Sequence, residues 1–193
     1  MRRNSGLNFN KRRKKLNIPL LKEIASWVLS CLIVIVIAYT LVRFFGLRTS
    51  VVGNAMAETL DNEEQILVNS FIYMVKEPKQ GDVIVFLPNG NDKSHYYVRR
   101  VMACPGDKVW IHDGALYVNG EIYNEDISVA SIEDPGIAGE ELTLEAGEYF
   151  VLGDNRNNSE DSRMANIGCI KKDYIIGKAW FHFKKLTDMG FIH

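Results

Sequence analysis

One uncharged, apolar run near the N-terminus restricts what this chain can fold into more than any other feature. Nineteen consecutive residues, 24–42, carry no charge. As a helix rising about 1.5 Å per residue, they would extend roughly 28 Å, about the thickness of the hydrocarbon core of a bilayer. Trp27 lies near one end and Phe44 near the other, where interfacial aromatic residues belong. The sequence therefore predicts a transmembrane anchor over residues 24–45.

Charge is divided sharply between the two sides of this run. Residues 1–23 contain eight Lys or Arg and one acidic residue, whereas residues 49–193 contain 13 basic and 23 acidic residues. Basic residues beside a single span favour the cytoplasmic side of the cell membrane. We therefore expect a cytoplasmic tail over residues 1–23 and an extracellular C-terminal domain. A basic tract can also bind nucleic acid, but beside a membrane span it usually sets topology, so no nucleic-acid partner is predicted.

A cleavable signal peptide is the alternative to an anchor. Ala55, Met56 and Ala57 imitate the A-x-A pattern of a cleavage site. However, the apolar run is longer than the usual h-region of about 7–15 residues, and Arg43 and Arg48 lie between it and the alanines. An uncleaved anchor is therefore favoured.

After residue 60 the sequence alternates between short strand-like runs and turns, which indicates a mainly β fold. The runs are rich in β-branched and aromatic residues and are separated by turn-forming residues. No amphipathic helix of convincing length interrupts them. The runs are QILVNSFIYMV (65–75), DVIVFL (82–87), HYYVRRVM (95–102), EYFVLGDN (148–155) and KAWFHF (178–183).

Residues 108–123 carry the clearest local signal. The dipeptides Asp113-Gly114 and Asn119-Gly120 separate three apolar-rich runs. Both dipeptides accept the positive φ angles of a type I′ turn, the tightest connection between antiparallel strands. We therefore predict a three-stranded meander here. The acidic, weakly patterned residues 124–147 that follow should form a long surface loop.

Three cysteines leave the redox state of the exported part open. Cys31 lies inside the predicted span, whereas Cys104 and Cys169 lie where a disulfide is permitted. These two residues either pair or remain as buried free thiols, and the second interpretation is the simpler. No C-x-x-C pair occurs and the histidines are scattered, so the sequence predicts neither a metal site nor a cofactor.

Four segments resemble the sequence boxes of the type I signal peptidase family, peptidase S26. They are GNAMAETL (53–60), GDVIVF (81–86), YYVRRVMACPGD (96–107) and GDNRNNSEDSR (153–163). Members of that family are membrane-anchored serine proteases that remove signal peptides outside the cytoplasmic membrane. The resemblance implies an antiparallel β core built from residues 49–107 and 146–193. Residues 108–145 would form a smaller inserted segment, a β-hairpin followed by the acidic loop.

The catalytic residues of the resembling family are missing from this chain. A Ser–Lys dyad is expected there, but Ala55 stands at the serine position and Arg99 at the lysine position, while Glu58 replaces a proline. Alanine cannot attack a carbonyl, and removing the nucleophile of a serine protease costs about 10⁶ in turnover. Arginine, with a pKa above about 12, stays protonated and cannot serve as a base. The sequence predicts a non-catalytic member, with an active signal peptidase as the alternative.

No neighbouring residue offers a convincing replacement nucleophile. Ser50 and Thr59 are out of register with the serine position, and Ser94 lacks a positioned base in the local sequence. His95 either faces the cleft or is an ordinary surface residue, and the latter is favoured. Laboratory inactivation would also change a serine to alanine and a lysine to arginine. It would not require Glu58, so natural loss of the site is the simpler interpretation.

The resemblance also assigns structural roles around the vacated site. It implies that Asp154 pairs with Arg100, that Ser159 lies near the arginine at the lysine position, and that Asp161 and Arg163 hold the last box together. These residues maintain the fold, so their presence does not by itself indicate catalysis.

We further expect the cleft to have changed from a catalytic to a binding site. The guanidinium of Arg99 should fill the space beside Ala55 and pair with a carboxylate, Glu58 being the nearest in sequence, with Met56 and Glu58 at the cleft. An extended chain would then add as a strand along residues 65–75. Degenerate members of the resembling family in Gram-positive bacteria act as chaperones or assembly factors for sortase-built pili. The resemblance therefore implies an exported partner, such as a pilin subunit or other pilus-assembly machinery.

Overall fold

The computed structural model describes residues 17–45, 47–125, 127–185 and 188–192. Most of the predicted cytoplasmic tail, residues 1–16, lies outside the described residues. The chain divides into two compact units, Met1–Thr40 and Leu41–His193.

The apolar run forms the centre of a single long helix, α1 (Ile18–Phe45). Its segment Ile18–Thr40 has a mean hydropathy of 2.2 and no buried side chain, so it is long and apolar enough to cross a membrane. The helix begins six residues before the predicted span. Pro19 explains this early start, because proline is tolerated in the first turn of a helix, where its missing N–H has no partner to lose.

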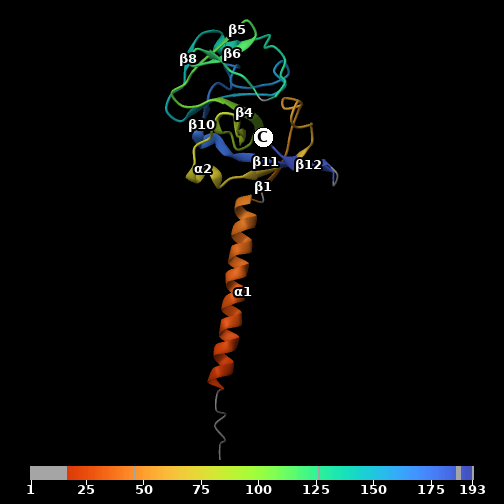
Figure 1. Ribbon diagram of the computed structural model, residues 1–193, viewed down its shortest axis with the longest axis vertical. Coiled ribbons are helices and arrows are strands. Elements are labelled where there is room, and N and C mark those ends of the chain that lie inside the picture. Colours follow the sequence, from red (N-terminus) through yellow and green to blue (C-terminus); the bar gives the residue numbers. More distant parts are fainter. Residues whose placement is uncertain (1–16, 46, 126, 186–187, 193) are drawn as a thin grey trace, which may run out of the picture. The chain divides into compact units, whose positions relative to one another are not determined.

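The prediction of a mainly β fold is confirmed. Within the described residues, the strands form an eight-stranded and a four-stranded sheet, and every paired neighbour is antiparallel. Figure 1 shows β5, β6 and β8 of the smaller sheet gathered away from β1 and the short helix α2 (Ile72–Val75). The larger sheet contains β1 (Leu47–Ser50), β2 (Gln65–Asn69), β3 (Val83–Phe86), β4 (Tyr97–Ala103), β9 (Glu148–Leu152), β10 (Ile170–Lys171), β11 (Ile175–Lys185) and β12 (Asp188–Phe191). The smaller contains β5 (Lys108–His112), β6 (Ala115–Val118), β7 (Glu121–Ile122) and β8 (Leu142–Thr143).

The larger sheet is buried on both of its faces at β3 and β4. Val83 and Val85 pack into one hydrophobic cluster, whereas Ile84 and Phe86 pack into another. Successive side chains of a strand point to opposite faces, so a strand with two covered faces is apolar throughout. On β4 this alternation sends the neighbouring side chains of Arg99 and Arg100 to opposite sides of the sheet.

The predicted meander is confirmed, with both turns in the expected conformation. Asp113 and Gly114 have φ angles of 50° and 75°, and Asn119 and Gly120 have φ angles of 54° and 84°. The strands on either side pair as tight hairpins, with His112 opposite Ala115. Asx-Gly dipeptides reach these angles at the lowest cost, which is why the local sequence was sufficient to locate the turns.

The predicted strand over residues 65–75 is wrong in its second half. β2 ends at Asn69, whose side-chain Oδ1 accepts hydrogen bonds from the backbone N–H groups of Phe71 and Ile72, both at 3.1 Å. This local turn redirects the chain into α2. The expected strand addition along this segment is also excluded, because β2 lies between β1 and β11 and both of its edges are occupied.

The predicted surface loop over residues 124–147 is more ordered than its composition indicated. It contains a 3₁₀ turn, η2 (Gly136–Gly139), and the strand β8, which pairs with β5. Ile132, Ala138 and Leu144 are buried in the hydrophobic cluster beneath the smaller sheet. These three residues cover the cluster. Their spacing follows neither the helical nor the strand period, so the sequence pattern did not indicate their burial.

The cysteines of this unit are free thiols. Cys104 and Cys169 pack against different hydrophobic clusters, so they do not form the disulfide that the sequence left open. Burial raises the pKa of the Cys169 thiol to about 11, and it also raises the pKa of Cys104. Both thiols are therefore protonated at neutral pH and poorly reactive.

Substitution of Gly120 by alanine should destabilise the smaller sheet. Its φ of +84° lies in a region that costs an L-residue about 1–2 kcal/mol, while nothing lies within 4 Å of an added Cβ. Denaturant unfolding should therefore report a loss in that range. Gly139→Ala is the matched control, since its φ is not in the left-handed region and its added Cβ meets only the Pro135 ring, no closer than 3.4 Å. Equal losses from both variants would contradict the assignment of the cost to φ.

Candidate functional site

The segment around Ala55 is a turn held down by the polar tract that follows β9. The backbone N–H of Asn155 donates to the carbonyl of Ala55 at 3.0 Å, and its side-chain amide donates to the carbonyl of Asn54, also at 3.0 Å. Gly153 lies directly against this contact. A Cβ added there would come within 2.5 Å of the Ala55 carbonyl oxygen and 2.2 Å of Ser159 Oγ, so only glycine lets the two segments approach this closely.

A cavity of about 480 Å³ opens beside Ala55. It brings together Ala55, Arg99 and Ser159, which come from three segments far apart in the sequence. The two positions that correspond to the catalytic dyad of the resembling family therefore share one cavity. The remaining lining residues are Val52, Gly53, Asn54, His95, Tyr96, Tyr97, Asn157, Asn158, Glu160 and Met164.

Two residues predicted for the cleft do not line this cavity. Met56 is completely buried in the hydrophobic cluster beneath the larger sheet, because the turn at Ala55 points the next side chain inward. Glu58 is exposed to solvent and is not among the residues that line the cavity. The alternation of buried and exposed positions in this turn could not be read from its composition.

Arg99 reaches the cavity but forms different contacts from those predicted. Its Nε donates to the carbonyl of Glu160 at 2.8 Å and its Nη1 to the carbonyl of Val98 at 2.7 Å. The guanidinium carbon lies 5.0 Å from the centre of the Tyr97 ring, a cation–π distance. The expected ion pair with Glu58 is wrong. One carbonyl belongs to Val98 on the same strand as the arginine, and the other belongs to Glu160 of the polar tract. Glu58 is exposed to solvent instead.

The environment of Arg99 is poor in water. Only 6% of the residue is exposed, and this burial lowers the pKa of the guanidinium from its ordinary value. The negative charges of Asp161 and Glu160 act in the opposite direction. Burial disfavours a charged group, and nearby carboxylates favour a cation. Desolvation is the larger of these effects here.

Arg100 points to the other face of the sheet, where it forms the predicted ion pair with Asp154. Two parallel hydrogen bonds of 2.9 and 2.8 Å join Nε and Nη2 of the guanidinium to the carboxylate. The carboxylate is fully buried and also accepts a 2.6 Å hydrogen bond from the hydroxyl of Thr59. Thr59 belongs to the same turn as Ala55, so this ion pair links the turn to β4 and to the polar tract after β9.

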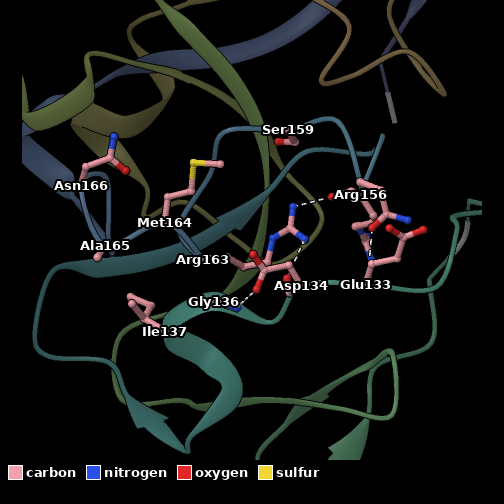
Figure 2. A pocket seen from close by; sticks show the side chains of 11 residues that line it. Glu133, Asp134, Gly136, Ile137, Arg156, Ser159, Arg163, Met164, Ala165 and Asn166 are labelled. Atoms are coloured by element: carbon pink, nitrogen blue, oxygen red, sulfur yellow. Dashed lines mark hydrogen bonds between the residues drawn. The ribbon is translucent and has the colours of Figure 1, made fainter.

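A second network orders the polar tract itself. The carboxylate of Asp161 is fully buried and pairs with Arg163 through bonds of 2.8 and 2.9 Å, as the predicted structural roles required. Arg163 also donates to the backbone carbonyls of Asp134 and Arg156, which ties the tract to the inserted segment (Figure 2). Arg156 is itself buried and pairs with Glu125.

Beside this network lies a second hollow of about 500 Å³. It shares Asn157, Ser159 and Met164 with the cavity at Ala55, so the two hollows adjoin along these residues. Figure 2 shows the side chains of Met164 and Ile137 at this hollow, both to the left of the Arg163 network.

Two hydroxyl groups lie at or near the cavity beside Ala55. The hydroxyl of Thr59 is bonded to Asp154, and Ser159 Oγ has no hydrogen-bond partner in the described part of the chain, so no base is placed to accept its proton. His95 lines the cavity and is also exposed to solvent. The two alternatives that the sequence left for it, a position at the cleft and a position on the surface, therefore both hold in part. The cavity combines one buried cation with hydroxyl groups and several aromatic or apolar walls.

Several residues of the site carried no signal that the sequence could disclose. Thr59 bonds to Asp154, 95 positions away, and Glu160 accepts a bond from Arg99, 61 positions away. Tyr97 presents its ring to Arg99 on the same strand. The pairing of Arg156 with Glu125 crosses from the polar tract into the acidic segment. Thr59, Tyr97, Arg156 and Glu160 lie within the segments that resemble the family, but the resemblance assigned them no contact.

Comparison with known proteins gives a consistent result. The family model for signal peptidases of the peptidase S26 group matches residues 24–184. Signal peptidase I P of Bacillus subtilis subsp. natto is 35% identical over 174 residues, which cover 86% of this chain and 89% of that protein. Signal peptidase IB of Staphylococcus aureus strain COL is 34% identical over 182 residues, covering 86% and 93%. A solved structure, that of a signal peptidase I from Enterococcus faecalis V583, is 30% identical with a TM-score of 0.41 over 54% of this chain and 97% of that chain.

Removal of the Asp154 carboxylate should lower the free energy of unfolding of the protein. Asp154→Ala leaves the guanidinium of Arg100 buried and unpaired, and breaking a buried pair in this way costs about 3–5 kcal/mol. Glu141→Ala is the control, because its pair with Lys108 is more than half exposed and such pairs contribute about 0–1 kcal/mol. Denaturant unfolding should separate the two variants clearly. A loss from Asp154→Ala no greater than that from the control would contradict the central role of the pair.

Proposed function

This chain belongs to the signal peptidase family, peptidase S26, and we propose that within it the protein holds exported polypeptides without cleaving them. The observation that carries the proposal is the occupancy of one cavity by Ala55 and Arg99, at the two dyad positions implied by the family resemblance. A site of this shape keeps room for a polypeptide but offers neither a nucleophile nor a base.

The arginine cannot take the place of a lysine base. Lowering an arginine pKa from its ordinary value to about 8 would cost roughly 7 kcal/mol at 1.36 kcal/mol per pKa unit. A domain of ordinary stability, about 5–15 kcal/mol in all, could hardly sustain that cost. Burial acts in this direction on the pKa of Arg99, but its two carbonyl acceptors bind the protonated form and oppose the loss of the proton.

The networks around the cavity support binding as the retained activity. The buried pair of Arg100 with Asp154 and the buried pair of Arg163 with Asp161 hold the segments that form the cavity wall. Pre-formed walls lower the entropy cost of capturing a flexible chain. In this proposal the ancestral scaffold persists because it positions a binding surface rather than a reacting group.

We place the binding domain outside the cell. The proposed orientation rests on the basic residues of the N-terminal tail, with α1 as the anchor. The polypeptides that the domain meets there would be exported proteins close to the membrane surface. By the family resemblance, the partner we propose is a pilin subunit or another component of sortase-dependent pilus assembly, with the protein as a chaperone or assembly factor.

The purified full-length protein should not cleave a signal-peptide substrate. Mass spectrometry after prolonged incubation should detect only the intact substrate, because neither Ala55 nor Arg99 can perform its step. The single variants Ala55→Ser and Arg99→Lys should also be inactive, since one lacks the base and the other the nucleophile. Cleavage at one defined site by the unmodified protein, abolished by denaturation, would show an active peptidase instead.

Photocrosslinking in cells should capture the partner from the cavity. A photoreactive residue at position 52 is suitable, because Val52 lines the cavity and is 57% exposed. Glu58 serves as a nearby exposed control outside the cavity, and Glu140 as an exposed control on the inserted segment. We expect an exported protein to be captured only from position 52. Equal capture from all three positions would move the partner surface away from the cavity.

A further inference from the structure

Arg99 differs electrostatically from the other buried arginines of the molecule. Four arginines are buried in the described part of the chain, and three of them form ion pairs with carboxylates that are themselves buried or nearly so. Those three pairs are Arg100 with Asp154, Arg156 with Glu125 and Arg163 with Asp161. Within the same described residues, Arg99 has no carboxylate within ion-pair distance.

This difference leaves a buried charge with incomplete compensation. Arg99 is 6% exposed, and its guanidinium donates hydrogen bonds from Nε and Nη1 to two backbone carbonyls and lies over the Tyr97 ring. Its remaining terminal nitrogen, Nη2, has no protein acceptor among the described residues. Carbonyl dipoles offset only part of the cost of burying a cation, and an opposite charge offsets more of it. A bound anion would therefore gain from meeting this guanidinium.

A second group at the same cavity also lacks a partner. Ser159 Oγ is buried and makes no hydrogen bond with the residues that the structure describes. It lines the cavity together with Arg99. A guanidinium N–H and a hydroxyl are both donors, and a carboxylate presents two oxygens that can each accept. Among the described residues, a cation without an ion-pair partner and a hydroxyl without a hydrogen bond thus line one cavity, and together they form the donor set of a carboxylate site.

We propose that the cavity lined by Ala55, Arg99 and Ser159 binds a carboxylate of an exported polypeptide. The inference rests on the proposed function. It names the chemical group, an acidic one, that the cavity would hold. The carboxylate has two possible sources, a free C-terminus or an Asp or Glu side chain within the segment.

The walls of the cavity define what accompanies the carboxylate. Val52, Tyr96 and Met164 line it, so apolar surface lies beside the polar donors. The cavity of about 480 Å³ falls within the usual range for ligand sites, about 300–1,000 Å³, and admits more than one residue. The ligand should therefore be a carboxylate flanked by small or apolar side chains, not a strongly charged phosphate group.

Glu160 limits the negative charge that the site accepts. Its exposed carboxylate lines the cavity and accepts a 2.7 Å hydrogen bond from the hydroxyl of Tyr97. The negative charge of Glu160 acts on Arg99 and weakens the attraction for an incoming anion. A monoanion is favoured over a dianion for this reason. Glu160→Gln keeps an oxygen for Tyr97 but removes the charge, so this variant should bind carboxylates more tightly.

Four short peptides test the proposal on the full-length protein in detergent micelles, by titration calorimetry or NMR. Acetyl-Ala-Glu-Ala-amide carries only a side-chain carboxylate, and acetyl-Ala-Ala-Ala carries only a C-terminal one. Acetyl-Ala-Gln-Ala-amide and acetyl-Ala-Ala-Ala-amide are the uncharged controls. We expect at least one acidic peptide to bind about tenfold or more tightly than its uncharged control, as a charge-assisted hydrogen bond permits. The tighter of the two acidic peptides identifies the source of the carboxylate.

Variants locate the site. Arg99→Gln should remove the preference for the acidic peptides, Ser159→Ala should reduce it, and Glu160→Gln should increase it. Glu141→Gln, which changes an exposed acid of the inserted segment, should leave the preference unchanged. Melting temperatures of all variants are measured in parallel. If Arg99→Gln does not fold, the opposite effects expected of Glu160→Gln and Ser159→Ala still decide the result.

The outcomes separate this inference from the proposed function. Equal binding of acidic and uncharged peptides, or an acidic preference that survives Arg99→Gln, overturns the carboxylate site. If that happens while position 52 still captures an exported protein in cells, the non-catalytic holding function stands with a different ligand. If instead the protein cleaves a signal peptide, the proposed function fails, and the peptide titrations still report whether the cavity prefers a carboxylate.

Discussion

The buried ion pair of Arg100 with Asp154 is the interaction on which the rest of the site depends. It joins β4 to the polar tract after β9, and the hydroxyl of Thr59 adds the turn that contains Ala55. Three segments, separated by as many as 95 residues, are thereby fixed against one another. Because the carboxylate is fully buried, each of these contacts forms in a low-dielectric environment, where an unpaired charge would be costly.

On the opposite face of β4, a second buried arginine has a different electrostatic environment. Arg99 is adjacent to Arg100 in sequence, and the two-residue period of a strand places the two guanidinium groups on opposite sides of the sheet. One cation is neutralised by a buried carboxylate, and the other meets backbone carbonyls and a cavity. A structural arginine and a candidate ligand-binding arginine thus follow each other directly along the chain.

Contacts of the polar tract hold the wall of the cavity in place. Gly153 still permits the close approach of the polar tract to Ala55, and Asp161 still orders that tract through Arg163. These contacts stabilise the fold whether or not a peptide bond is cut. A scaffold held in this way suits the binding role proposed above.

The sequence by itself determined the features that depend on near neighbours. The uncharged run predicted the long apolar helix, and the Asx-Gly dipeptides predicted the meander of the smaller sheet. The pairing of Arg100 with Asp154, 54 positions apart, was predicted only through the family resemblance of the motifs. Only the tertiary structure decided that β2 lies inside the sheet, that Met56 is buried, and that Arg99 meets carbonyls instead of Glu58. A turn or a membrane helix is specified within a few residues, because its hydrogen bonds or apolar length are local. Strand neighbours and the partners of a buried charge are chosen by packing between segments tens of residues apart, which no local pattern encodes.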